Sequence, residues 1–128
     1  MAAYTRKIAA WSSREGVRVH PEDDDLSIAI VLTTVASESD ATTIARALVD
    51  ERLAACVHVC AEMQSVYRWK GAVSVDAERQ LVIKTTGHRL AALELRLAAL
   101  HPYELPEFVV VRGAASVAYS RWVGASVG

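Results

Sequence analysis

The sequence has little of what defines several common classes of protein. Among its 128 residues there are two cysteines, Cys56 and Cys60, which are too few for a disulfide scaffold. Four residues apart on one strand, their α-carbons would lie ~13 Å from each other, too far to form a disulfide or to chelate one metal ion. No apolar run approaches the ~18 residues of a membrane-spanning helix, so we expect no membrane partner.

An excess of positive charge is also absent. Lys and Arg number 14 against 15 Asp and Glu, which gives a net charge of −1 and an isoelectric point of about 6.4. Nonspecific nucleic-acid binding requires a basic surface, so nucleic acid is not an expected partner. Arg6, Lys7 and Arg14 are not followed by an apolar stretch of signal-peptide length. We therefore expect a cytoplasmic protein.

The motifs of common enzyme classes are missing as well. The sequence contains no GxSxG, P-loop, HExxH or GxGxxG pattern. Glu104 and Glu107 are three positions apart across Pro106, and this spacing does not define a general acid and base. We predict that the chain is not an enzyme.

What the sequence does contain is enough apolar material for one folded domain. Apolar residues make up 52% of the chain, and its length fits a single domain. Residues 1–25 show neither helical nor strand periodicity and end in the acidic run 22–25, so we interpret them as a flexible N-terminal extension. Residues 26–128 are the predicted domain.

Apolar periodicity predicts alternating strands and helices within this domain. Branched residues in 26–35 indicate a central strand, and Ser37 followed by Asp40 indicates a capped helix start. Lys70-Gly71 is typical of a hairpin turn. The predicted elements are strands at 26–35, 55–69, 73–85 and 107–111, helices at 38–53 and 87–100, a bulge or kink at 62–65, and a last helical turn formed by Tyr119, Trp122 and Val123.

This order predicts an α+β fold of the ferredoxin-like βαββαβ type, with a long β-hairpin and a short C-terminal helix. Two helices would cover one face of a four-stranded antiparallel sheet. The other face would leave apolar and aromatic side chains in water. We therefore expect further copies of the chain to cover it and to pair through the long hairpin.

Five short segments, taken together, closely resemble a known family. They are LAACVHV (53–59), SVYRWKG (65–71), LVIKTT (81–86), HPYELPE (101–107) and YSRW (119–122). Their order and separations resemble those of the CutA family of divalent cation tolerance proteins, over roughly residues 27–123. The resemblance implies a CutA-like, ferredoxin-like protomer in a PII-like homotrimer, and a metal ion response that involves copper or another divalent ion.

The resemblance also implies a metal site at His101 and Glu107. In some relatives, residues matching these two and a cysteine of the first strand are associated with copper. Thr33 stands at that cysteine position here, and its hydroxyl is a poor ligand for such an ion, so the implied site is incomplete. The alternative is that His101 caps the C-terminus of the second helix, where a partly cationic ring is favourable.

Aromatic and charged side chains predict two kinds of surface between subunits. Tyr67, Trp69, Tyr119 and Trp122 are predicted to pack at the trimer interface, and Lys84, Tyr103, Glu104 and Trp69 to line a ligand-binding cleft. The leading functional hypothesis is a trimeric divalent cation tolerance protein that binds copper, another divalent ion or a small ligand at these clefts. The alternative is a PII-like signalling module that binds a metabolite or nucleotide and a partner protein.

Overall fold

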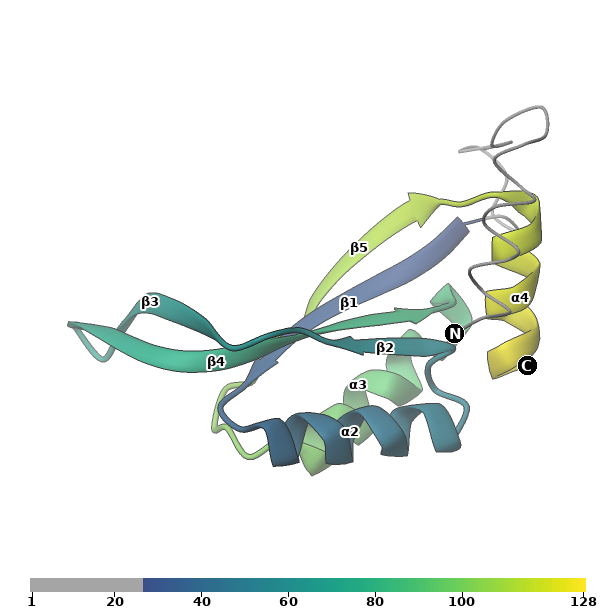
Figure 1. Cartoon of the computed structure of the whole chain (residues 1–128). Coiled ribbons are helices and arrows are strands. Elements are labelled where there is room, and N and C mark those ends of the chain that lie inside the picture. The colour runs from purple at the N-terminus through teal and green to yellow at the C-terminus, as the bar shows by residue number, and fades with distance from the viewer. Residues whose placement is uncertain (1–26) are drawn as a thin grey trace.

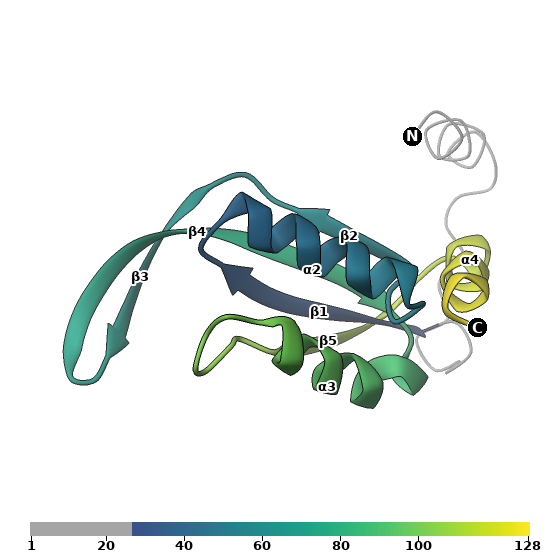
Figure 2. The same ribbon diagram turned by 90° about the horizontal axis from the view of Figure 1, so that it is seen from below.

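The computed structural model describes residues 27–128, so the interpretation of residues 1–25 lies outside the described part of the chain. Helices α2 and α3 lie on the same side of an antiparallel sheet, and the hairpin of β3 and β4 extends well beyond it (Figures 1 and 2). The elements are β1 (Ser27–Val35), α2 (Glu38–Asp50), β2 (Cys56–Val59), β3 (Met63–Trp69), β4 (Ala72–Thr85), the 3-10 turn η2 (Gly87–Arg89), α3 (Leu90–Leu100), β5 (Val109–Ala114) and α4 (Val117–Val127).

The sheet has the ferredoxin-like arrangement that the order of elements predicts. Its strands follow in the order β2-β4-β1-β5, and each neighbouring pair is antiparallel. In the central strand β1, Ile30 lies between Lys84 of β4 and Val111 of β5. The branched residues of 27–35 therefore form a central strand, as predicted. The last strand, β5, begins later than the predicted 107–111, since its pairing with β1 starts at Val109 opposite Leu32.

A bulge divides the predicted second strand into β2 and β3. The N–H of Cys60 donates to the carbonyl oxygen of Gln80 at 2.9 Å, whereas Met63 pairs with Glu78. From Cys60 to Met63 the chain advances three residues, while the partner strand β4 advances two, from Gln80 to Glu78. One extra residue on one strand of an antiparallel pair defines a β-bulge. The interruption begins at Cys60, slightly before the predicted 62–65, and the long hairpin continues on its far side.

The hairpin turn falls at the predicted residues. Lys70 and Gly71 have φ angles of +50° and +82°, and positive φ at both central residues is characteristic of a type I′ turn. Such a turn matches the right-handed twist of the two strands it joins. It therefore lets β3 and β4 pair from Met63 opposite Glu78 out to Trp69 opposite Ala72.

Local signals set the boundaries of α2. The hydroxyl of Ser37 accepts a hydrogen bond from the N–H of Asp40 at 3.0 Å, which is the predicted cap. The helix ends at Asp50 and not at 53 as predicted, because Arg52 adopts a left-handed φ of +58°.

The later helices differ from the prediction more than α2 does. Residues 87–89 form the turn η2, so α3 begins at Leu90, and it ends before His101-Pro102 as predicted. The last apolar contact set is part of an 11-residue helix, α4, and not of a single turn. Ser116 starts this helix by accepting a hydrogen bond from the N–H of Tyr119 at 3.2 Å. No helix within residues 27–128 has the length and apolar character needed to cross a membrane.

The core lies between the two helices and one face of the sheet. In β4, Leu81 and Ile83 are fully buried toward the helices, while Val82 and Lys84 point to the other face and are half-buried. The core comprises Val31, Val35, Ala41, Ile44, Leu48, Leu53, Ala54, Leu81, Ile83, Leu93 and Leu97. The side chains that the strand and helix periodicities place on the apolar faces are therefore those that the fold buries.

The other face of the sheet is only partly covered within one chain. Helix α4 packs across one end, against β1 and β4. Beyond it, Val109 and Val111 of β5 remain exposed, as do Val66, Val73 and Val75 of the hairpin. An apolar surface of this kind is typical of an interface. Assembly of several copies of the chain stays a prediction at this point.

Candidate functional site

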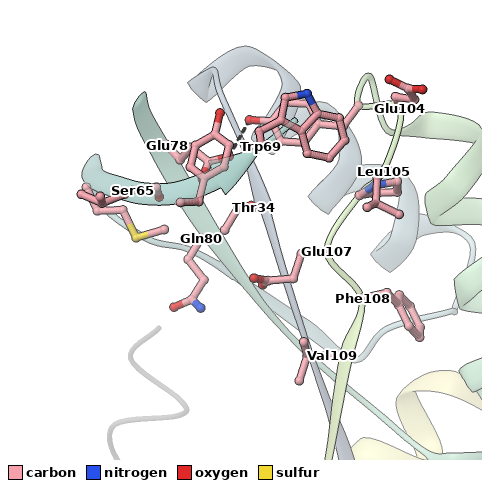
Figure 3. A pocket seen from close by; sticks show the side chains of 15 residues that line it. Thr34, Ser65, Trp69, Glu78, Gln80, Glu104, Leu105, Glu107, Phe108 and Val109 are labelled. Carbon is pink, nitrogen blue, oxygen red and sulfur yellow. Dashed lines mark hydrogen bonds between the residues drawn. The ribbon is translucent and has the colours of Figure 1, made fainter. Parts of the chain in front are cut away.

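A groove of about 910 Å³ lies between the base of the hairpin and the segment that joins α3 to β5 (Figure 3). Its lining comes from four parts of the chain that are distant in sequence. These residues are Thr34 of β1, Met63, Ser65, Val66, Tyr67 and Trp69 of β3, Glu78 and Gln80 of β4, and Tyr103, Glu104, Leu105, Pro106, Glu107, Phe108 and Val109. The groove thus lies where the hairpin continues beyond the residues of β4 that pair with β1.

The groove joins acidic groups to aromatic side chains. Its wall includes the carboxylates of Glu78, Glu104 and Glu107, and Figure 3 shows the side chains of Glu107 and Gln80 directed toward the open space. Lysine, arginine and histidine do not occur among the lining residues. The surface is therefore negative and partly apolar, a combination that suits cationic ligands.

Tyr103 ties the α3–β5 segment to the hairpin. Its hydroxyl donates to Oε2 of Glu78 at 2.6 Å, across the groove from one wall to the other. Burial, followed by this hydrogen bond to a carboxylate, raises the pKa of Tyr103 above its ordinary value. The phenol therefore stays protonated at neutral pH and remains a donor. The hydroxyl of Tyr67 donates in the same manner to Asp76, and this hydrogen bond raises the pKa of Tyr67.

His101 holds two backbone groups with its two ring nitrogens. The N–H of Tyr103 donates to Nδ1 at 3.1 Å, so Nδ1 carries no proton. Nε2 must then carry the hydrogen, and it donates to the carbonyl oxygen of Thr34 at 2.8 Å. Pairing of β5 with β1 stops at Leu32, so β5 supplies no backbone partner for Thr34. The ring of His101 binds the Thr34 carbonyl in place of that missing strand partner. The ring is thus neutral, buried and fixed in one tautomer.

This geometry bears on both interpretations of His101 that the sequence suggests. His101 is the C-cap residue of α3, since its own N–H donates to the carbonyl of Leu97 at 2.8 Å. Its ring, however, contacts Thr34 and Tyr103 and not the helix end, so it is no cationic cap. Copper or zinc ligation would require Nδ1 to give up the Tyr103 N–H.

Thr33, which stands where the resemblance implies a cysteine ligand, lies on a different surface from Glu107. Thr33 and Thr34 are adjacent on β1, so their side chains point to opposite faces of the sheet. Thr34 lines the groove with Glu107, while Thr33 is fully buried on the helix face. Within residues 27–128 no group of three or more His, Cys, Asp or Glu side chains could hold a metal ion. The structure therefore places Glu107 in the groove and Thr33 away from it.

Thr33 gives a first prediction, because its Oγ1 has no hydrogen-bond partner in the core. Thr33→Val keeps the shape and removes an unpaired buried hydroxyl, so we expect the free energy of unfolding to rise by about 1 kcal/mol. Urea unfolding at one protein concentration measures it, with Thr34→Val at the groove as the matched control, expected within about 0.5 kcal/mol of wild type. A less stable Thr33→Val would show that the hydroxyl is paired.

The predicted cleft residues separate into two groups within one chain. Trp69, Tyr103 and Glu104 line the groove, whereas Lys84 does not. Lys84 lies four positions from Gln80 along β4, about 13 Å away. Its Nζ is 5.4 Å from the ring centroid of Tyr119, which in turn lies 5.5 Å from the ring of Trp122. The ammonium and the two carboxylates of the expected cleft therefore do not meet within a protomer.

Sequence reasoning missed Glu78, Gln80 and Thr34 as members of the site. Side chains alternate between the two faces of a strand, and Glu78 and Gln80 of β4 fall on the face that the helices do not cover. The sequence pattern of the strand already indicates this placement. Their position beside Tyr103 depends on the bulge at Cys60 and on the path of the α3–β5 segment. No local pattern in the sequence specifies either feature.

The chain is similar in sequence to proteins of one known family. The model of the CutA1 divalent ion tolerance protein family matches residues 29–126. A Thermus thermophilus relative, "Divalent-cation tolerance protein CutA", is 52% identical over 82 residues, which are 64% of this chain and 80% of that protein. The human "Protein CutA" is 38% identical over 85 residues, and the match spans 66% of this chain but 48% of the human protein. The chain thus matches about half the length of that relative.

Solved structures agree with the sequence comparison. CutA from Synechococcus elongatus superposes with a TM-score of 0.78 and 39% identity, covering 87% of this chain and 96% of that one. The Thermus thermophilus protein gives a TM-score of 0.76 with 46% identity, covering 79% and 99%. Fold, motif series and family model coincide over the same residues. The chain therefore belongs to the CutA1 divalent ion tolerance protein family.

Proposed function

We propose that the chain is a non-catalytic, homotrimeric divalent cation tolerance protein that binds an ion or a small ligand at clefts between its subunits. One observation carries the proposal: the acidic, aromatic groove opens beside apolar surface that a single chain leaves uncovered. Ligand sites commonly form where two folded units meet. Each groove would be one wall of such a cleft, and the neighbouring copy would supply the other.

The exposed side chains of the hairpin support the proposal of a closed ring of three chains. Val66 and Val75 form a cross-strand pair on one surface of the hairpin, and their side chains are 64% and 55% exposed. Tyr67 and Trp69 are exposed on the other surface of β3, and Tyr119 and Trp122 stand together at the far end of the sheet. A hairpin that reaches beyond its own core can pair with the next copy and leave no open edge once the ring closes.

For an ion, the proposed carboxylate ligand is Glu107, which is exposed in the groove wall, and Glu104 is a second exposed carboxylate on the same segment. His101 remains the proposed nitrogen ligand, and copper is the ion that the chemistry of an imidazole and a carboxylate favours among the candidates. Binding there requires local rearrangement at Tyr103, whose N–H now occupies Nδ1.

Calorimetry with copper and zinc tests this assignment. A site that uses the Glu107 carboxylate is expected to lose about tenfold in affinity in Glu107→Gln, since a charged ligand becomes a neutral amide. Glu94→Gln, on the exposed side of α3, is the matched control and should bind as the wild type does. Identical isotherms for the wild type, Glu107→Gln and His101→Ala would remove both residues from the site.

The signalling alternative has less support. It needs a cation in the cleft to hold an anionic metabolite, and Lys84 lies at Tyr119, away from the groove. The negative groove wall also opposes an anion. A thermal shift with nucleotides that Lys84→Ala abolishes and metals do not affect would restore this alternative.

Absence of catalysis and a cytoplasmic location complete the proposal. Among the acidic groups of the groove, Glu78 is bound by the hydroxyl of Tyr103 and the other two are exposed, and none is paired with a nucleophile in the described residues. Both cysteines are free thiols, which suits a reducing compartment.

A further inference from the structure

The groove selects among cations by the way it combines charge and aromatic rings. A hard divalent ion requires several oxygen ligands that converge at roughly 2.0–2.6 Å. Oε2 of Glu78 is already bound to the hydroxyl of Tyr103, and residues 27–128 contain no group of three acidic, histidine or cysteine side chains suited to a metal. The negative charge of the groove is therefore spread out and not focused on one point.

Dispersed negative charge next to the faces of aromatic rings suits an organic cation better than a metal ion. An alkylammonium ion needs no fixed coordination sphere and is attracted to the face of an aromatic ring within ~6 Å of its centroid. Tyr67, Trp69 and Tyr103 all belong to the groove wall. Dispersed carboxylates then provide long-range attraction, and the rings provide contact with the carbon chain.

One ring of this wall, that of Trp69, already has an ammonium group of the chain beside it. Nζ of Lys70 lies 5.7 Å from the ring centroid of Trp69. Lys70 is not a lining residue, so its charge does not fill the groove. Tyr103 is held in place by its hydrogen bond to Glu78 and by a tilted contact with the ring of His101, with centroids 4.8 Å apart. The groove is therefore preorganised and keeps its negative character.

We propose that this groove binds a small organic cation of the polyamine type, through Glu104 and Glu107 and the ring of Trp69. The proposal rests on the proposed function for the location of the groove in an intersubunit cleft, and it deepens that function by naming the class of ligand. It requires no movement of His101, in contrast to ligation of a metal ion by that ring.

Spermidine is the probe, titrated calorimetrically into the whole chain at constant ionic strength. We expect saturable binding, an affinity about tenfold lower in Glu107→Gln and in Trp69→Leu, and a change below about twofold in Glu94→Gln. Magnesium chloride at the same ionic strength should not displace the ligand. Glu107→Gln is nearly isosteric and exposed, so it decides the result even if Trp69→Leu alters assembly.

Three results would overturn this proposal. They are no heat with spermidine, equal affinity in the wild type and Glu107→Gln, and displacement by magnesium at matched ionic strength. Sedimentation of the same samples separates the two levels of inference. If the wild type is a trimer but does not bind spermidine, only the proposed class of ligand is wrong. If the wild type sediments as a single folded chain, the proposed intersubunit cleft is wrong.

Discussion

His101→Ala is expected to lower the free energy of unfolding by about 3 kcal/mol, because it leaves two backbone groups without partners. The carbonyl of Thr34 lies beyond the last residue that β5 pairs, and the N–H of Tyr103 points at Nδ1 of the lost ring. His101 is 7% exposed, so water reaches neither group easily in the folded chain. Urea unfolding followed by circular dichroism, at one protein concentration, measures the loss.

The same measurement separates a structural histidine from a metal ligand. If the ring acts through backbone hydrogen bonds, the loss of stability persists after the protein has been stripped of metal with a chelator. If the ring acted only as a ligand, stripped wild type and stripped variant would unfold together. His88→Ala is the matched control, since His88 is exposed on η2, and we expect it to stay within about 0.5 kcal/mol of wild type. A fully stable His101→Ala would contradict the hydrogen-bond geometry.

Much of the fold could be predicted because periodicity and turn chemistry act locally. The alternation along β4 identifies Leu81 and Ile83 as core residues, and Lys70-Gly71 supplies the positive φ angles of the turn. The length of helix α4 was underestimated because its small residues give a weak apolar pattern. Its N-cap residue, Ser116, is nevertheless of a type that commonly starts a helix.

The groove was less predictable, because its members meet through long-range geometry. One extra residue at the Cys60 bulge changes which hairpin side chains face Thr34 and Tyr103. The role of His101 also depends on a backbone carbonyl 67 positions away in the chain. Side-chain identities indicate that an imidazole can bind a metal, but only the fold shows that both nitrogens already have partners.

The double variant Val66→Glu/Val75→Lys is expected to dissociate the proposed trimer. The two valines are direct cross-strand partners and are among the most exposed apolar side chains of the described residues. Opposite charges at this pair keep the hairpin itself paired, so the change acts on the contact between chains. Two valines in each of three chains, at about 1.5 kcal/mol apiece, contribute on the order of 9 kcal/mol to assembly. Sedimentation velocity at micromolar concentration should then show a smaller species.

Leu95→Glu provides the matched control for this loss. Leu95 is 76% exposed on α3, on the helix side of the sheet and away from the hairpin, so its replacement should leave the sedimentation coefficient unchanged. If the hairpin variant sediments as the wild type does, the valine surface is not the contact and the uncovered face must be closed in another way. If Leu95→Glu dissociates the assembly instead, the chains associate through their helices. The groove would then open to solvent and not to a neighbouring subunit, and its ligand would be held by one chain alone.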